Sequence, residues 1–372
     1  MKILFASHSS GLAGAEQSLL HLVQEAARRG HTGVVVLPER GPLRGQVEEL
    51  PGSFEVVILR NRLWMGRRFS RLVGTVRALQ ATLDIPGYVA HIRAGNYDAV
   101  VVNSSVSPVP LVAARIAGIP ALQMVRESLI SNPMLRSALP KALIKRLIFS
   151  WSSFVICISK YVAAQYDYPS RVIYPQVSER FLDFQSPAST TPIMPQRAVI
   201  CGTISPEKGQ LDAIRAIKVA RDQGAEISLD IYGQGKAADI YEVELLIREL
   251  QLSNWIKFKG PASDMISVYL SADLALVCSR NEGFGKTTAE AILLSRPVIA
   301  YGLGGTLEIL EYGGGISTSS SPEEMGLALY EVATQPQLFE KLRKEARDSK
   351  LRFKLLSSAR LVIDCVEDMA GG

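Results

Sequence analysis

Short apolar runs alternate with amphipathic segments along most of the chain. The first run, residues 2–7, is followed by a loop of small residues and by a segment, 15–29, whose leucine and valine side chains recur at helical spacing. Gly30 is a typical residue to end that helix. Further apolar runs, which we interpret as strands, lie at 34–37, 55–59, 99–103, 121–125 and 154–159. Continuous apolar strands separated by helices predict a parallel sheet that is covered on both faces.

A change of composition interrupts this alternation at 185–196, where proline, serine and threonine predominate, and we interpret this stretch as a linker. Beyond the linker, strands are expected at 198–201, 227–232, 255–258, 274–278 and 297–300, and helices at 208–222, 238–250, 265–270 and 287–294. The pattern therefore predicts an α/β protein with two doubly wound, Rossmann-like parallel-sheet domains, 1–184 and 197–354. A last helix, within 355–372, is free to join the first domain.

Length and composition agree with this organisation. The chain has 372 residues, 47% of them hydrophobic, which is too long for one ordinary domain and sufficient for two cores. The first apolar run is too short for a secretory signal, and no run approaches the roughly 20 apolar residues of a membrane span. The four cysteines stand among apolar neighbours without metal-ligand spacing. We interpret them as core residues of a soluble or peripheral protein in a reducing compartment, the cytoplasm.

Charge is distributed unevenly. The net charge is +5, but residues 1–184 hold 21 Lys and Arg against 12 Asp and Glu, whereas residues 185–372 hold 20 against 24. The first half therefore carries +9 and the second half −4. This asymmetry indicates that the first half faces an anionic partner. Since no nucleic-acid-binding module is present, we exclude nucleic acid as that partner.

Ligands of open parallel α/β sheets bind beyond the carboxyl ends of the strands, and several unusual loops fall there. In the loop 11–16, Gly14 would let a ligand approach the backbone closely, and the start of the helix that follows favours an anion. A glycine required only by a tight turn is an equally good interpretation. The loop does not match the Gly-x-Gly-x-x-Gly dinucleotide fingerprint, which argues against a dehydrogenase.

Two loops of the second half add to this set. The loop 202–209 places Lys208 at the predicted start of a helix, where a cation gains nothing from the helix dipole. An anionic ligand explains this charge better than the alternative, a solvated surface lysine. Gly233 begins a glycine turn after the strand 227–232, and this is an ordinary turn unless its neighbours also bind a ligand.

The most specific signal is a glycine-rich loop between a strand and a helix. Two acids stand eight residues apart, Glu282 in the loop and Glu290 in the helix. A carboxylate on the buried side of a helix needs partners, and the cis-diol of a ribose or sugar can donate two hydrogen bonds to it. The free N–H groups of Gly285, Lys286 and Thr287 can hold phosphate oxygens.

Together these motifs resemble family 4 of the retaining glycosyltransferases. The stretch from Glu282 to Glu290 resembles the family's Glu-x7-Glu motif, 202–209 its Lys-Gly loop, and 11–16 its Gly-Gly-Ala-Glu loop. The run 297–308 resembles the strand and loop after the motif helix. The motifs occur in the family's order over nearly the whole chain. The resemblance implies the GT-B fold, in which two domains face each other across a cleft, and transfer of a sugar from a nucleotide-diphosphate-sugar to a hydroxyl acceptor.

The resemblance also assigns roles to residues. Glu290 would bind the ribose of a UDP- or GDP-linked donor, and Lys208 its diphosphate, together with the backbone N–H groups of Gly14 and Thr287. Glu282 would hold the donor sugar. The full set of donor-binding positions is Gly14, Thr203, Gly233, Phe284, Gly285, Lys286, Thr287 and Glu290.

The chain departs from the family at two positions. Family members usually have an arginine shortly before the lysine, and Thr203 stands there in this chain. They often have a histidine after a strand in the middle of the first domain, and here Arg126 and Glu127 stand in its place. We hypothesise that Arg126 supplies the missing positive charge, so that the catalytic residues are Glu282, Lys208 and Arg126.

Cleaving the donor leaves a diphosphate with growing negative charge, and its stabilisation is the main catalytic task. No Asp-x-Asp sequence is present to hold a metal, so we expect no metal and no cofactor besides the donor as co-substrate. We expect retention by same-face attack, with the leaving phosphate taking the acceptor's proton and Glu282 positioning the sugar. The alternatives are a nucleotide-sugar epimerase, which the Glu-x7-Glu spacing does not support, and a catalytically silent nucleotide-sugar-binding partner protein.

The stretch 59–79 is the most basic of the chain and contains no acid. Its arginines are Arg60, Arg62, Arg67, Arg68, Arg71 and Arg77, and between them lie Leu63, Trp64, Met65, Phe69, Leu72 and Val73. A helix from about Gly66 would be either a core helix with a basic exposed side or a peripheral helix on an anionic membrane. Because the excess charge lies outside the donor-binding half, we favour the membrane. A glycan or lipid-linked glycan acceptor on the inner face of the membrane would place the protein in polysaccharide or glycolipid assembly.

Overall fold

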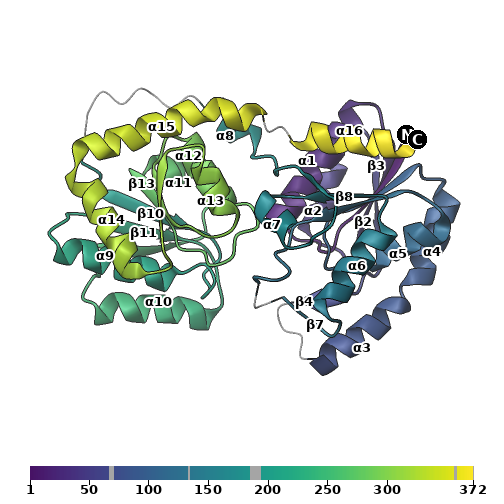
Figure 1. Ribbon diagram of the computed structural model, residues 1–372, viewed down its shortest axis with the longest axis horizontal. Coiled ribbons are helices and arrows are strands. Elements are labelled where there is room, and N and C mark those ends of the chain that lie inside the picture. The colour runs from purple at the N-terminus through teal and green to yellow at the C-terminus, as the bar shows by residue number, and fades with distance from the viewer. Residues whose placement is uncertain (67–70, 133–134, 185–193, 356–357, 372) are drawn as a thin grey trace. The chain divides into compact units, whose positions relative to one another are not determined.

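The structure is a computed structural model that describes residues 1–66, 71–132, 135–184, 194–355 and 358–371. Contacts between residues divide the chain into two compact units (Figure 1). The first unit comprises Met1–Gln176 and Leu356–Gly372, and the second comprises Val177–Leu355. The two units are described separately below.

The first unit is built on a parallel sheet. Its strands are β1 (Lys2–Ala6), β2 (Thr32–Leu37), β3 (Ser53–Ile58), β5 (Ala99–Val102), β6 (Ala121–Val125), β8 (Phe154–Cys157) and β9 (Arg171–Val172). Within the described residues they form one seven-stranded sheet in the order β3-β2-β1-β5-β6-β8-β9. Two short strands, β4 (Met65–Gly66) and β7 (Arg136–Ser137), pair antiparallel beside it.

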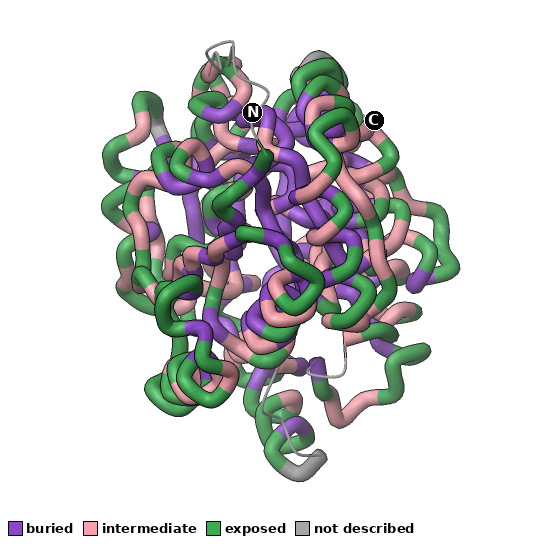
Figure 2. The backbone as a smooth tube through the Cα atoms, turned by 90° about the vertical axis from the view of Figure 1, so that its left-hand side faces the viewer, coloured by how far each residue is buried: buried purple, intermediate pink, exposed green. Residues whose placement is uncertain are grey.

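The helices of the first unit connect these strands. They are α1 (Gly14–Arg28), α2 (Pro42–Glu48), α3 (Arg71–Thr82), α4 (Ile85–Gly95), α5 (Val109–Ala117), α6 (Lys141–Trp151), α7 (Lys160–Ala164) and the last helix, α16 (Ser358–Gly371). The strands β1 and β5 are buried almost throughout, because helices cover both faces of the sheet. Figure 2 shows the buried segments of the backbone in the interior and the exposed segments around them.

The second unit repeats the design. Its strands are β10 (Arg197–Cys201), β11 (Ser228–Tyr232), β12 (Ile256–Gly260), β13 (Leu274–Val277), β14 (Val298–Tyr301) and β15 (Gly315–Thr318). They pair in parallel in the order β12-β11-β10-β13-β14-β15. Its helices are α8 (Glu179–Asp183), α9 (Gln210–Asp222), α10 (Ala237–Glu249), α11 (Met265–Leu270), α12 (Lys286–Leu293), α13 (Gly305–Leu310), α14 (Pro322–Thr334) and α15 (Pro336–Leu355).

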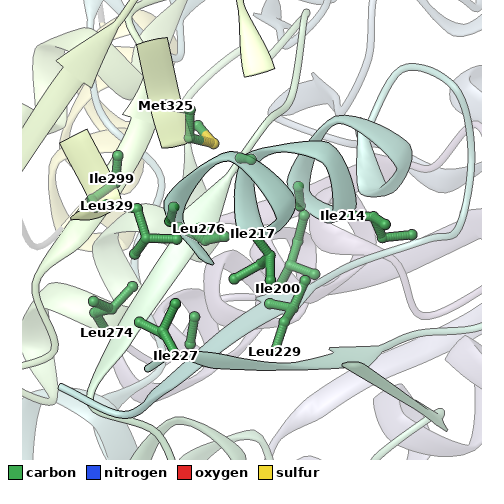
Figure 3. Close-up of a cluster of buried hydrophobic side chains, with 14 of the residues drawn as sticks. Ile200, Ile214, Ile217, Ile227, Leu229, Leu274, Leu276, Ile299, Met325 and Leu329 are labelled. Carbon is green, nitrogen blue, oxygen red and sulfur yellow. The ribbon is translucent and has the colours of Figure 1, made fainter. Parts of the chain in front are cut away.

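A continuous apolar core fixes the second unit. Figure 3 shows Ile214 and Ile217 of α9 packed against Ile200 and Leu229 of the sheet, with Leu329 of α14 beside them. All of these side chains are buried. Full burial of one such side chain contributes about 1.5–3 kcal/mol, so this layer holds the sheet and its carboxyl-end loops in place. The two-domain parallel-sheet architecture predicted from the sequence is confirmed.

The boundary between the units differs from the predicted one. Residues 177–184 were expected in the first domain, but α8 packs on α12 and α15 and lies in the second unit. Phe181 of α8 is buried and its ring meets the ring of Tyr269 edge to face, which explains this placement. Most of the predicted linker 185–196 lies outside the described residues.

The last helix belongs to the first unit. It packs on α1 and β5 (Figure 1). Arg29 forms ion pairs with Asp364 at 2.7 Å and with Glu367 at 2.8 Å, and His31 lies 2.7 Å from Glu367. The chain therefore returns to its starting unit after the second unit is complete. No helix in the described ranges is both long and apolar enough to cross a membrane.

The helix that we predicted in the basic stretch from about Gly66 corresponds to α3. Gly66 belongs to β4, the described part of α3 begins at Arg71, and 67–70 lie outside the described residues. Trp64 and Met65 are buried in the core of the unit, and the Trp64 indole N–H donates to the Ser105 carbonyl at 2.8 Å. These two side chains are therefore not available to a membrane.

Candidate functional site

The loops after β10, β11 and β13 lie side by side, because these three strands are neighbours in the sheet. The Gly202 N–H donates to the Tyr232 carbonyl at 3.0 Å, and the Ile204 N–H donates to the Gln234 carbonyl at 2.9 Å. Gly233 has a φ of 155°, and a Cβ on it would lie 1.8 Å from the Gly202 carbonyl oxygen. Gly233 is therefore required by the contact between these two loops.

We predicted that Lys208 begins a helix, but in the structure it precedes the helix. Helix α9 starts at Gln210, and Gly209 caps it with a φ of 69°. A Cβ on Gly209 would lie 2.5 Å from the Cys278 carbonyl oxygen, so the turn holding Lys208 packs directly on the end of β13. Gln210, which was not among the predicted site residues, fixes the same turn: its side chain donates to the carbonyl of the exposed Thr203 at 3.1 Å.

The Lys208 ammonium forms an ion pair with the Glu282 carboxylate. The two residues are 74 positions apart in the sequence, and their side chains are 30% and 14% exposed. Two residues that we had selected for adjacent roles thus meet at the carboxyl edge of the sheet. Their opposite charges stabilise each other, and both remain open to a ligand.

The loop that carries Glu282 has a fixed backbone. The Glu282 carbonyl accepts from the Gly305 N–H at 2.8 Å. A Cβ on Gly305 would lie 2.5 Å from the Cα of the buried Phe284. Gly285 then caps α12 with a φ of 96°, and no side chain caps this helix. The start of α12, with Lys286 and Thr287, therefore presents backbone N–H groups that can bind an anion.

Glu290 lies one turn further along α12 and is buried. One carboxylate oxygen accepts from the Tyr269 hydroxyl at 3.5 Å, and the other lies 3.8 Å from the Lys286 ammonium. Both contacts are long, and burial raises the pKa of Glu290 above its usual value. Burial and the charge of Glu290 also raise the pKa of Cys201 to about 12. A buried carboxylate with weak partners can accept stronger hydrogen bonds from a ligand diol.

Tyr269 is a contact of Glu290 that the sequence did not reveal, since α11 is short and its pattern is that of a core helix. The ion pair between Arg280 and Asp212, at 2.6 Å, was also not foreseen. It ties the loop after β13 to α9. The position of Arg280, two residues before Glu282 in the sequence, is the one signal that could have pointed to this ion pair.

In the first unit, Gly14 is the first residue of α1. It has no positive φ, and a Cβ on it would meet nothing within 4 Å. The turn itself therefore does not require glycine at this position. The steric interpretation of this glycine is therefore not supported, and the close approach of a ligand to its backbone stays a prediction.

Arg126 follows β6 and is held by Asn103, which follows β5. Its Nε donates to the Asn103 carbonyl and its Nη2 donates to the Asn103 side chain, both at 2.8 Å. Burial lowers the pKa of Arg126 to about 10, against the opposing effect of the Glu127 and Glu16 charges. The Glu127 carboxylate accepts from the hydroxyl groups of Ser104 and Ser105. These contacts join the loops after β5 and β6 into one rigid polar edge.

The predicted site residues thus form one group in each unit. Lys208, Glu282 and Glu290 lie in the second unit, and Gly14 and Arg126 in the first. A cavity of about 860 Å³ lies elsewhere in the first unit, at the amino ends of β8 and β9, and we exclude it from the site on that ground. Among the residues that the structure describes, no group of three or more His, Cys, Asp or Glu side chains could hold a metal ion.

Two models of glycosyltransferase families match this chain, one on each unit. The model of the glycosyl transferase 4-like domain matches residues 13–168, and the model of the glycosyl transferases group 1 matches residues 183–349. Between them the two models cover most of both units.

Relatives are distant. The chain is 26% identical over 229 residues to an uncharacterized glycosyltransferase of Methanocaldococcus jannaschii, a match that covers 58% of this chain and 61% of that protein. It is 31% identical over 131 residues to the D-inositol 3-phosphate glycosyltransferase of Corynebacterium kroppenstedtii, covering 34% of this chain and 29% of that protein. Both matches span less than two thirds of the relative's length.

A solved structure extends the similarity to the whole fold. The crystal structure of HepE from Anabaena, in complex with UDP and glucose, has a TM-score of 0.77 and 21% sequence identity to this chain. The match covers 99% of this chain and 100% of HepE. At this identity the similarity shows the fold, which is GT-B.

Proposed function

Because the chain belongs to the family 4 glycosyltransferases, we propose that it transfers a sugar, with retention of configuration, from a nucleotide-diphosphate-sugar to a hydroxyl group of a glycan. One observation carries this proposal. The ion-paired Lys208 and Glu282 lie at the carboxyl edge of the same sheet as the uncapped start of α12 and the buried Glu290. Such a group suits a ligand that combines a diphosphate with two sets of hydroxyl groups.

Each part of the donor has a matching partner in this proposal. The ribose diol donates to Glu290, and the diphosphate contacts Lys208 and the N–H groups of Lys286 and Thr287. The sugar hydroxyls contact Glu282 and the backbone at Phe284 and Gly285, and the base lies near Gly233. The complex of HepE with UDP and glucose favours a UDP-linked donor over a GDP-linked one.

The proposed mechanism follows from the charges. The bond between the sugar and the diphosphate breaks, and Lys208 and the start of α12 stabilise the negative charge of the leaving group. The acceptor hydroxyl attacks from the same face and gives its proton to the departing phosphate. Glu282 positions the sugar and stabilises the positive charge that develops on it.

Gly14 provides a prediction on the first unit. Gly14→Ala should leave the unfolding temperature unchanged or slightly higher, since alanine is preferred to glycine in helices. It should weaken donor binding about tenfold, because a methyl group would keep the diphosphate from the backbone N–H. The matched control is Gly45→Ala in α2, where a Cβ also meets nothing within 4 Å and donor affinity should not change. Calorimetric titration measures the donor affinity of both variants. Equal donor affinity in Gly14→Ala and wild type would remove Gly14 from the donor site.

We propose that Arg126 substitutes for the arginine that family members have near Thr203. Its burial and its contacts with Asn103 give the guanidinium a fixed position, which favours a catalytic charge over a mobile surface one. In this proposal its positive charge stabilises the leaving diphosphate.

Transfer should not require a metal ion. Because the chain has no Asp-x-Asp sequence and the proposed charges on the diphosphate come from side chains and helix N–H groups, activity should persist in excess EDTA. Product formation with and without EDTA measures this. Loss of activity in EDTA and its return with Mn²⁺ or Mg²⁺ would overturn the proposed mechanism.

We also propose that the first unit rests on an anionic membrane surface, where a lipid-linked glycan would be the acceptor. The specific observation is an apolar stripe on and just after α3, where Val73, Val76, Leu79 and Leu83 are 43%, 48%, 65% and 72% exposed. These side chains recur at roughly helical spacing and lie beside the basic Arg77. An exposed apolar stripe flanked by arginine suits the boundary between headgroups and acyl chains.

Vesicle sedimentation tests this placement. The protein should sediment with vesicles that contain anionic lipid at low salt and be released at high salt, since each arginine near such a surface contributes about 1 kcal/mol and is screened by salt. Replacing Leu79 and Leu83 by Asp should abolish sedimentation. The control, Leu327→Asp on α14, changes an exposed leucine of the second unit and should sediment as wild type does. Equal sedimentation with neutral and anionic vesicles would contradict a membrane role.

Nucleotide release with and without a glycan acceptor tests the function itself. A transferase releases nucleotide faster when an acceptor is present. An epimerase would convert the donor sugar without releasing nucleotide, and a silent binding partner would bind the donor and change nothing. Either of the last two results would replace the function proposed above.

A further inference from the structure

A second pocket of about 480 Å³ lies in the first unit, at the carboxyl ends of β1, β2 and β3. Its lining includes His8 after β1, Glu39 after β2, Arg60 and Arg62 after β3, and Arg77 of α3. This volume falls within the usual range for small-ligand sites. Three of the arginines of the basic stretch therefore converge on one hollow instead of covering a flat surface.

The loop that carries Arg60 and Arg62 is held in place by the fold. Asn61, between Arg60 and Arg62, is buried; its side chain donates to the Ser7 carbonyl at 3.2 Å and accepts from the Ser107 hydroxyl. This anchors the loop after β3 to the end of β1. Arg62 is fixed in turn by an ion pair with Asp84 at 2.7 Å and a hydrogen bond to the Gln80 carbonyl at 3.0 Å.

The pocket has an excess of positive charge. Its lining contains three arginines and one acid, the exposed Glu39. The charge of Arg62 is balanced by Asp84, which is not part of the lining. Arg60 is exposed and makes no ion pair within the part of the chain that the structure describes. An arginine fork without a carboxylate partner is suited to bind a phosphate group with two parallel hydrogen bonds.

A second feature adjoins the pocket at His8: this lining residue lies beside Glu16, which is not itself part of the lining. Glu16 of α1 is only 2% exposed, and its Oε1 has no hydrogen-bond partner. The His8 ring lies next to it: its Nε2 is 3.7 Å from this oxygen, and its Nδ1 is likewise without a partner. A buried carboxylate oxygen without a hydrogen bond is costly, so this pair is arranged for polar groups that a ligand brings.

We infer that this pocket binds the acceptor, and that the acceptor is a polyhydroxy compound carrying a phosphate group held by Arg60, Arg62 and Arg77. The hydroxyl groups of the acceptor lie toward His8, which lines the pocket beside Glu16. That the ligand is the acceptor rests on the proposed sugar transfer. That the pocket binds a phosphate ester does not. The phosphate belongs either to a small soluble ester or to a lipid headgroup, since the arginines recognise the group that both share.

Calorimetric titration with glycerol 3-phosphate, in the presence of saturating UDP, tests the inference. UDP fills the phosphate-binding positions near Lys208, so that the heat reports on the first unit. Glycerol 3-phosphate should bind saturably and glycerol should not. Arg60→Gln and Arg77→Gln should each weaken this binding about 10- to 100-fold, as expected for loss of a charge-assisted contact. The matched control is Arg115→Gln, which changes an exposed arginine of α5 outside the lining.

The outcomes separate this inference from the proposed function. Two ligands are compared: glycerol 3-phosphate and vesicles of phosphatidylcholine and phosphatidic acid. Binding to either one that is weakened in Arg60→Gln supports the pocket, and the ligand that binds identifies the source of the phosphate. No binding in either arm overturns the inference, and so does binding that is equal in Arg60→Gln and Arg115→Gln. Failure to bind UDP contradicts the proposed function, and glycerol 3-phosphate titrated alone then still tests the pocket.

Discussion

Lys208→Ala is expected to lower the rate of sugar transfer about 100- to 1,000-fold, the range found when one group that stabilises transition-state charge is removed. The lysine contacts the Glu282 carboxylate in the structure, and we propose that it also neutralises the diphosphate as the bond to the sugar breaks. Donor affinity should fall less, about 10- to 100-fold, since only part of the charge is present before reaction. Turnover under saturating donor and calorimetric titration measure the two effects.

Lys218→Ala is the matched control for this substitution. Lys218 lies on α9, is 38% exposed and pairs with Asp222 one turn away, so its loss should leave transfer and donor affinity unchanged. A Lys208→Ala variant that binds the donor as tightly as wild type would show that the lysine is an ordinary surface charge. The thermal unfolding of both variants should be compared, because Lys208→Ala also leaves Glu282 without its partner.

Glu290→Gln is expected to have two opposite effects. Donor affinity should fall about 10- to 100-fold, because an amide accepts hydrogen bonds from the ribose diol less strongly than a carboxylate. Stability without ligand should rise at neutral pH. Burial raises the pKa of Glu290 in the folded protein, which means that the ionised carboxylate disfavours folding.

The sign of the pH dependence follows from the raised pKa. The folded protein holds the Glu290 proton more tightly than the unfolded chain does, so the destabilisation appears as pH rises above the unfolded value of 4.5. Glu290→Gln should therefore unfold at a higher temperature than wild type at pH 7, and the two should converge in acid below that value. Glu244→Gln, at an exposed position of α10, is the control and should show neither effect. A Glu290→Gln variant that is less stable at pH 7 and binds the donor normally would make Glu290 a structural residue.

The architecture was predictable because the strands are short apolar runs with little ambiguity. The predicted strands are present, most of them within two residues of the expected bounds. The pattern assigned no helix or strand between 301 and the last helix, although this region contains α13, β15, α14 and α15. Helix α15 carries many charged residues along its length, so its apolar side is weak in the sequence, and α14 is recognised by its packing on α9.

The candidate site was predictable in its residues but not in its contacts. Glu282, Glu290 and Lys208 stand out by residue type beside glycine-rich turns. The pairing of Lys208 with Glu282 depends on the register of β10 and β13, which no local pattern contains. The start of α9 was misplaced by two residues because Gly209 takes a left-handed conformation and delays the helix. The linear pattern of the basic stretch also does not show that Arg60, Arg62 and Arg77 line one pocket, because only the folded loops create it.

The most direct test of nucleotide-sugar binding is a thermal-shift screen of the purified chain with UDP-, GDP- and ADP-linked sugars. A ligand that binds only the folded protein at about 100 times its dissociation constant adds about 2.7 kcal/mol of stability, which is about 5–10 °C for domains of this size. We predict that at least one donor, a UDP-sugar first, produces such a shift in wild type and in Lys218→Ala, and a much smaller one in Lys208→Ala. A screen in which no nucleotide-sugar changes the unfolding temperature, or in which Lys208→Ala shifts as wild type does, would contradict the assignment of this site.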